Sequence, residues 1–244
     1  MSSPEKEKHK RILVAFLVRN GEKWLGRFLE CLDKLDYPRE YLKLVAVEGN
    51  SEDDSWHVLS YYAYTHQGTW LTKIDVGSEV GRYKRLAMLK NKIVDAVLKD
   101  EDFVLWIDSD IVAFPSNLLK ELVKANVDIV APYILIEGNN QFYDTLAFRK
   151  NKLKFAAMLS HVQNDQGMLI KCLPDELFEV DSVGTCMLVK AEVYREGVRF
   201  PESNEESEQV LFCDKAREKG FKVFADPRLK ATHANLPFYG EEWH

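Results

Sequence analysis

The chain of 244 residues is 46% hydrophobic, which is enough for a sizeable core in one large domain or two small ones. Its longest apolar run near the start, Ile12–Val18, is far shorter than the roughly 20 residues that span a bilayer, so we expect no transmembrane segment. The net charge of −6 argues against a protein that mainly binds a nucleic-acid backbone but does not exclude one, because the segment Gly81–Lys92 is strongly basic.

The first ten residues, "MSSPEKEKHK", are polar and contain no apolar segment. They predict a disordered tail rather than a secretory signal, and by default a cytoplasmic protein. Strand and helix patterns then alternate, as in a layered α/β domain with a largely parallel sheet. Strands are predicted at residues 11–18, 42–49, 70–76, 103–107 and 128–134, and helices at residues 22–35, 56–64, 82–98 and 115–126.

The periodicity fades between about residues 137 and 172, which predicts loops or an irregular hairpin. Regular patterns return as a strand and a helix over 184–194, a helix over 208–220 and a strand over 221–227. We find neither a repeat nor a linker, so residues 11–244 are predicted to form one domain, with a nucleotide-binding half (11–131) and an acceptor half (132–244). Cysteines 31, 172, 186 and 213 lack the spacing of metal sites and are predicted to be reduced core residues.

Two aspartates, Asp108 and Asp110, follow the apolar strand 103–107 in "FVLWIDSDIVAFP". Ligands of open α/β sheets bind beyond the carboxyl ends of the strands, and a spacing of two in an extended chain points both carboxylates the same way. Mn²⁺ and Mg²⁺ prefer oxygen ligands, which one or two carboxylates and a diphosphate supply. The pair therefore predicts a divalent metal that binds a nucleoside diphosphate, although a solvated acidic turn would contain the same residues.

At this point the chain resembles a known family. The segment "RYKRLAMLKNKIVDAVLKDEDFVLWIDSDIVAFPSNLLKEL", followed by "YDTLAF", "VDSVGTCMLVKAEVYREGVRFP" and "KATH", is similar to the fungal mannan-polymerase-type α-mannosyltransferases, which are GT-A fold glycosyltransferases. The resemblance covers almost the whole chain and is most specific around "WIDSDIV" and from "VGT" to "RFP". It implies a single-domain, three-layer α/β/α GT-A fold with a mostly parallel central sheet, a nucleotide-sugar donor and a Mn²⁺ ion.

The same resemblance implies the residues of the site. The metal ligands would be Asp110, Asp108 and His233. The donor would be bound by Arg19, Asn20, Glu48, Asn50, Ser51, Arg82, Arg85, Ile107, Asp108 and Ser109. Ordinary alternatives exist for each group: the residues after the first two strands also suit turns and caps, the two helix arginines suit a solvated helix face, and a lone histidine is often structural.

Four carboxylates, Asp108, Asp110, Asp181 and Glu208, are the candidate catalytic residues. Asp181 precedes Gly184, where the backbone could approach a sugar closely, and could accept hydrogen bonds from sugar hydroxyls. Glu208 lies where inverting GT-A enzymes supply the base that deprotonates the acceptor, often in a Glu-Asp pair, but here a glutamine follows it. The resemblance implies retention of configuration, which needs no such base. Capping of the following helix is the ordinary explanation of Glu208.

The sequence thus predicts a glycosyltransferase that uses Mn²⁺ or Mg²⁺ to move a hexose from a nucleotide sugar to a glycan or another hydroxyl acceptor. Mannose from GDP-mannose is the first expectation, with a UDP-sugar as the other. Three alternatives stay open: an inverting transferase with Glu208 as base, a sugar-nucleotide pyrophosphorylase, and a carbohydrate-binding protein without activity. The glycine-rich loop of a pyrophosphorylase is missing from "VRNGEKWLG", and the intact Asp108, Asp110 and His233 argue against an inactive protein.

Overall fold

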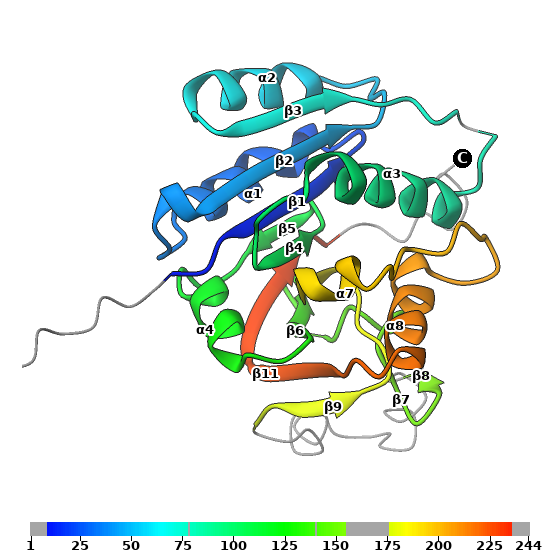
Figure 1. Ribbon diagram of the computed structural model, residues 1–244. Coiled ribbons are helices and arrows are strands. Elements are labelled where there is room, and N and C mark those ends of the chain that lie inside the picture. The colour runs from blue at the N-terminus through cyan, green and yellow to red at the C-terminus, as the bar shows by residue number, and fades with distance from the viewer. Residues whose placement is uncertain (1–8, 78, 140, 155–175, 236–244) are drawn as a thin grey trace, which may run out of the picture.

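A curved sheet of nine strands forms the middle of the molecule in the computed structural model, which describes residues 9–77, 79–139, 141–154 and 176–235 (Figure 1). Its strands are β1 (Ile12–Val18), β2 (Leu42–Glu48), β3 (Thr69–Lys73), β4 (Phe103–Ile107), β5 (Ile111–Ala113), β6 (Ile129–Ile136), β9 (Phe178–Val180), β10 (Cys186–Lys190) and β11 (Val223–His233). The order is β3-β2-β1-β4-β10-β6-β11-β5, and β9 pairs with β11. A separate short hairpin joins β7 (Arg149–Lys150) and β8 (Leu153–Lys154).

The sheet is mostly parallel, as predicted. Strands β3, β2, β1 and β4 run in one direction, and β6 and β11 are parallel to each other. Strand β10 lies antiparallel between β4 and β6, so β6 and β11 also share the direction of β4. The carboxyl ends of these strands therefore meet at one edge of the sheet, where an α/β fold binds its ligands.

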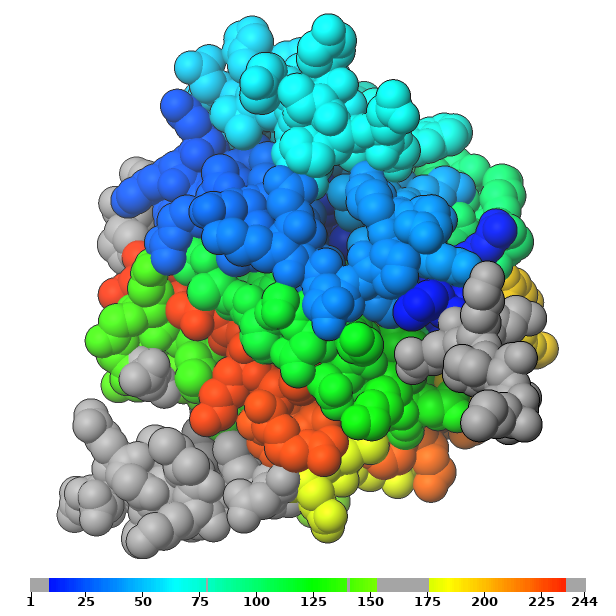
Figure 2. All heavy atoms as spheres, turned by 90° about the vertical axis from the view of Figure 1, so that its left-hand side faces the viewer, coloured from blue at the N-terminus to red at the C-terminus, as the bar shows by residue number. Residues whose placement is uncertain are grey.

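Helices cover both faces of the sheet and complete three layers. Helices α1 (Glu22–Asp33), α2 (Ser55–Thr65) and α4 (Leu118–Ala125) pack on one face. In the space-filling view of Figure 2 the blue and cyan residues of the first part of the chain lie together above the green and orange residues of later parts. Helices α3 (Arg82–Val97), α7 (Ala191–Arg195) and α8 (Glu208–Glu218) pack on the other face. Side chains of β1 alternate between the two layers: Val14 and Phe16 face α1, and Leu13 and Ala15 face α3.

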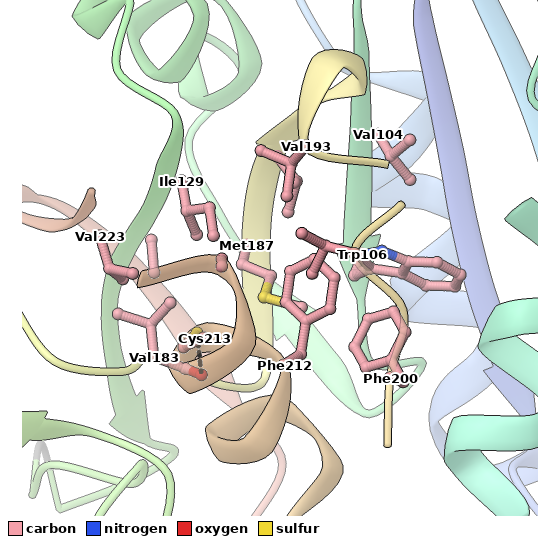
Figure 3. Close-up of a cluster of buried hydrophobic side chains, with 14 of the residues drawn as sticks. Val104, Trp106, Ile129, Val183, Met187, Val193, Phe200, Phe212, Cys213 and Val223 are labelled. Atoms are coloured by element: carbon pink, nitrogen blue, oxygen red, sulfur yellow. Dashed lines mark hydrogen bonds between the residues drawn. The ribbon is translucent and has the colours of Figure 1, made fainter. Parts of the chain in front are cut away.

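The layer beneath α8 is rich in aromatic residues (Figure 3). Phe200, which follows α7, stacks on Phe212 of α8 with 4.3 Å between ring centroids. The Phe200 and Trp106 rings are nearly perpendicular, with 5.6 Å between their centroids. The indole N–H of Trp106 donates a hydrogen bond of 2.7 Å to the hydroxyl of Tyr194. This packing fixes the strand that leads into the two aspartates.

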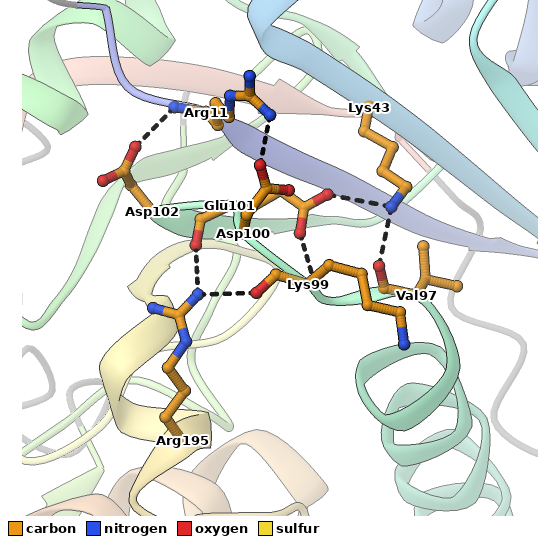
Figure 4. Close-up of polar contacts among 8 residues, drawn as sticks. All are labelled: Arg11, Lys43, Val97, Lys99, Asp100, Glu101, Asp102 and Arg195. Carbon is orange, nitrogen blue, oxygen red and sulfur yellow. Dashed lines mark hydrogen bonds and ion pairs between the residues drawn. The ribbon is translucent and has the colours of Figure 1, made fainter.

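The opposite end of the sheet, where β1 and β4 begin, is held by ion pairs (Figure 4). Lys43 contacts the buried carboxylate of Glu101 at 3.0 Å, and Arg195 donates to the carbonyl oxygens of Lys99 and Glu101. Because every parallel strand starts here, these contacts lie at the far end of the strands from Asp108. They stabilise the domain away from its ligand-binding edge.

Most predicted elements are confirmed within a few residues, but two strands were not predicted. Strands β5 and β9 are each only three residues long, too short for a recognisable alternation. Strand β11 continues to His233, well past the predicted end at residue 227, after a register shift between Asp226 and Lys230. Helix α4 begins at Leu118 rather than residue 115, because the Leu118 N–H bonds the Pro115 carbonyl in a turn.

The predicted tail and the cysteines are partly outside the described residues. Residues 1–8 are among those not described, and Lys10 pairs with Asp102 at 3.1 Å. Cys186 and Cys213 are free and buried, whereas Cys31 is half-buried and its thiol faces a backbone carbonyl. Cys172 lies outside the described residues.

Candidate active site

A cavity of about 130 Å³ opens at the carboxyl ends of β1 to β4. The loops after these strands and the first turn of α3 supply its walls, including Arg19, Asn20, Arg85, Asp108 and Asp110. Leu17, Val47 and Leu89 supply apolar surface from the strands and from α3. The cavity lining therefore combines apolar side chains with carboxylates and guanidinium groups.

Asp110 and His233 meet at this edge although they lie far apart in the sequence. The Nε2 atom of His233 lies 3.1 Å from Oδ2 of Asp110. Strand β5 explains the contact: it follows Asp110 and pairs antiparallel with the end of β11, and the Ala234 N–H bonds the Asp110 carbonyl oxygen at 2.8 Å. The two side chains are thus positioned by backbone pairing rather than by flexible loops.

The imidazole of His233 is held in a defined tautomer. Its Nδ1 lies 2.7 Å from the carbonyl oxygen of Ala234, which can only accept, so Nδ1 carries a hydrogen. Tyr143 stacks on the ring with 3.6 Å between centroids. Burial lowers the pKa of His233, but the hydrogen bond and the charge of Asp110 outweigh burial, so the pKa is raised above its usual value.

Asp108 lies beside a third carboxylate, Asp144, that the sequence analysis missed. Burial raises the pKa of Asp108 to about 7, the Lys90 charge lowers it, and the Asp110, Glu208 and Asp144 charges raise it. Burial likewise raises the pKa of Asp144 to about 6, while the hydrogen bond from Thr185 and the His233 charge act in the opposite direction. Both pKa values are thus raised mainly because the carboxylates are buried, and the charge of Asp110 adds to the effect in each case. Asp144 lies in "YDTLAF", one of the segments that carry the family resemblance, and this was the feature of the sequence that could have indicated it.

Asp110 also has an oxygen without a partner. Its Oδ1 is buried and makes no hydrogen bond among the described residues. A buried carboxylate oxygen of this kind is costly unless a cation or a donor satisfies it. Within the part of the chain that the structure describes, no three His, Cys, Asp or Glu side chains already have the spacing of a metal site.

Glu208 is the first residue of α8, and its carboxylate is bonded to Lys90 of α3 at 2.8 Å. Both side chains are almost fully buried. The Lys90 ammonium also lies 5.7 Å from the ring centroid of Trp106 and 5.2 Å from that of Phe200. The sequence analysis did not predict this pairing of Lys90, because its partner lies on a helix distant in the sequence.

The predicted donor-binding residues after β1 and β2 form one hydrogen-bonded unit. The Asn20 N–H donates to Oγ of Ser51 at 2.9 Å, and the Ser51 N–H donates to the carboxylate of Glu48. Asn20 and Asn50 both have left-handed backbone conformations, with φ of 52° and 63°. Of these four residues, Asn20 lines the cavity, and fully buried Glu48 supports the turn beneath it. The Asn50 amide donates to Asp75, another cavity residue, at 3.1 Å.

Three arginines lie around the cavity: Arg19 after β1, and Arg82 and Arg85 in the first turn of α3. Burial lowers the pKa of Arg85, and the positive charges of Arg19 and Arg82 lower it further. Arg85 donates to the carbonyl oxygens of Gly77 and Val80. Mutual repulsion among guanidinium groups favours an anion between them, and a diphosphate has the matching charge and geometry.

The chain is similar to a known family and to several known proteins. The Anp1 family model matches residues 69–171. The mannan polymerase II complex anp1 subunit of Schizosaccharomyces pombe is 21% identical over 279 residues, covering 93% of this chain and 64% of the relative. The mannan polymerase complex subunit mnn9 of the same yeast is 28% identical over 180 residues, covering 65% of this chain and 51% of the relative. The predicted resemblance to the fungal mannan polymerase subunits is confirmed. The chain spans only part of the length of these relatives.

The fold has a counterpart among solved structures. The mannosyltransferase PcManGT of Pyrobaculum calidifontis, in complex with GDP-Man and Mn²⁺, superimposes with a TM-score of 0.64 and 16% sequence identity. The match covers 98% of this chain and 60% of the other. The predicted GT-A fold is therefore confirmed.

Two predicted site residues lie elsewhere. The Asp181 carboxylate accepts a hydrogen bond from the Lys152 N–H and pairs with Arg217 at 3.2 Å, so its position does not support sugar binding. Close packing explains the glycine at position 184, because a Cβ atom added there would lie 2.6 Å from the Cβ atom of Ala147. The Ile107 side chain is buried in the apolar layer on the α1 side and does not line the cavity.

Ser109 lines the cavity and donates to the Leu17 carbonyl oxygen at 3.0 Å, which ties the two strand ends together. None of the described helices is long and apolar enough to cross a membrane.

Proposed function

We propose that the protein is a metal-dependent glycosyltransferase that moves a hexose from a nucleotide sugar to a hydroxyl group of a glycan or another acceptor. One observation carries the proposal: Asp110 and His233 meet at 3.1 Å beside a cavity with three arginines among its lining residues. The GT-A fold and the relatives, which are mannan polymerase subunits, support the same class of reaction.

The residues fit a divalent cation. Asp110 offers an unpartnered buried oxygen. The Nδ1–H of His233 bonds the Ala234 carbonyl, so Nε2, which contacts Asp110 in this structure, could bind a metal once it has lost its proton. Asp108 would complete the set, and carboxylate with imidazole suits Mn²⁺ better than Ca²⁺. When bound, Mn²⁺ or Mg²⁺ offsets the negative charge that develops on the departing nucleoside diphosphate.

The chain's own residues would position the donor. Arg82 and Arg85 would bind the diphosphate, and Asn20 lies where the nucleoside of a doubly wound fold belongs. Asp108 would hold the ribose or the donor sugar. GDP-mannose is the first candidate donor, because PcManGT was solved with GDP-Man and the yeast relatives are mannan polymerase subunits. A UDP-sugar is the second candidate.

We further propose that transfer retains the configuration of the sugar. An inverting enzyme needs a free carboxylate to deprotonate the acceptor, and Glu208 is the candidate. Its carboxylate is instead bonded to buried Lys90. A carboxylate engaged with an ammonium group in the core is poorly placed to accept a proton from a hydroxyl.

The test is to incubate the protein with Mn²⁺ and a panel of GDP- and UDP-sugars and to measure release of nucleoside diphosphate. Proton NMR of any transfer product would give its anomeric configuration. Asp110→Asn should be inactive, whereas Glu101→Gln, at the opposite end of the strands, should keep its activity while it is folded. Absence of both turnover and Mn²⁺-dependent GDP or UDP binding in the wild type would refute the proposal.

A further inference from the structure

The first turn of α3 carries Arg82 and Arg85, and the N-cap residue of the helix offers no side-chain cap. The N-cap residue is Gly81, which has no side chain to bond the exposed N–H groups. A helix start of this kind frays unless another group accepts those hydrogen bonds. The orientation of both arginines depends on that turn.

Asn204 supplies the missing cap from a distant segment. Its Oδ1 accepts a hydrogen bond of 3.0 Å from the N–H of Lys84, the third residue of α3. Its amide packs directly on Gly81, since a Cβ there would lie 2.4 to 2.5 Å from the Asn204 amide atoms. An asparagine at the N-cap position itself would accept a hydrogen bond from the same N–H, that of the third helical residue.

The segment that carries Asn204 is fixed at both ends to the same helix. At one end, Asn91 of α3 donates to the Phe200 carbonyl and accepts from the Phe200 N–H, each at 2.9 Å. At the other end, Glu208 bonds Lys90 at 2.8 Å. The Phe200 ring packs against both Trp106 and Phe212. Asn204 is therefore presented to α3 by a strap, residues 200–208, that is anchored in the core.

We propose that Asn204 is a positioning residue for the diphosphate of the donor: it caps α3 in trans and so holds Arg82 and Arg85 in place at the cavity. This inference rests on the proposed function, because it assigns the diphosphate to that cavity. Asn204 makes no contact with the ligand in this proposal and acts through the helix.

The experiment compares Asn204→Ala, Asn204→Asp and Glu202→Gln, an exposed control in the same strap. Losing an N-cap costs about 1 kcal/mol of helix stability, and the bound state needs this turn formed, so Asn204→Ala should weaken GDP binding in the presence of Mn²⁺ by up to about five-fold. It should raise the KM for the donor with little change in kcat. Asn204→Asp keeps the accepting oxygen and should restore most of the affinity. Glu202→Gln should behave as wild type.

Amide hydrogen exchange of residues 82–85 separates this inference from the proposed function. Faster exchange in Asn204→Ala, reversed in Asn204→Asp and accompanied by weaker binding, supports it. Wild-type exchange at these amides, or wild-type affinity for GDP in Asn204→Ala, overturns it. If the wild-type protein binds no nucleoside diphosphate at all, the proposed function is refuted, and the role of Asn204 toward a donor is refuted with it. The exchange rates of residues 82–85 would in that case still show whether Asn204 caps α3.

Discussion

Asp144 gives the sharpest test of the site, because its carboxylate is buried where negative charges accumulate. Asparagine at this position keeps the shape of the side chain and an oxygen that can accept the hydrogen bond from Thr185. It removes a carboxylate charge that burial and the neighbouring charge of Asp110 disfavour. We therefore expect Asp144→Asn to stabilise the metal-free protein at neutral pH.

The magnitude follows from the raised pKa. Burial moves the pKa of Asp144 from 3.8 to about 6, and each pKa unit is worth about 1.4 kcal/mol. The folded state thus carries a penalty of about 3 kcal/mol once the carboxyl is ionised in both states. Below the unfolded pKa both states are protonated and the penalty disappears. The gain in Asp144→Asn should accordingly be near zero at pH 4 and grow to its full value above about pH 6.

The assay is urea unfolding of both proteins with a chelator at several pH values between 4 and 8. Glu101→Gln is the matched control, because its buried carboxylate already bonds Lys43 and the Lys99 N–H, so neutralising it should destabilise the protein. A loss of stability in Asp144→Asn at pH 7, or a difference that does not change with pH, would refute the reasoning. Since a bound cation also relieves the penalty, excess Mn²⁺ should shrink the gain.

Three further predictions address the other charged groups. Asp110→Ala should abolish transfer while circular dichroism stays unchanged, and normal turnover in metal-containing buffer would exclude the site. In His233→Ala the Mn²⁺ concentration for half-maximal activity should rise at least about ten-fold. In the wild type the same concentration should rise as the pH falls, because the pKa of His233 is raised and a proton on its Nε2 competes with the metal. Glu208→Gln leaves the buried Lys90 ammonium without a charged partner and should cost about 3–5 kcal/mol of unfolding free energy. The double variant Lys90→Met, Glu208→Leu should recover most of this loss. Equal losses in the single and double variants would contradict the buried ion pair.

The sequence determined most of the helices and longer strands and the edge of the sheet where chemistry is expected. The run from Phe103 to Ile107 is apolar and ends on two aspartates, and local hydrophobic pattern decides such features. The resemblance added His233 and the arginines of α3, and the structure brings these residues to one edge.

Only the tertiary structure decided how those residues are paired. Strand β5 has three residues and exists because β11 pairs with it, yet it is the element that joins Asp110 to His233. The partner of Glu208 and the cap of α3 are likewise contacts between segments more than a hundred residues apart. Such contacts depend on how layers stack around the sheet, and no local pattern of side chains encodes them.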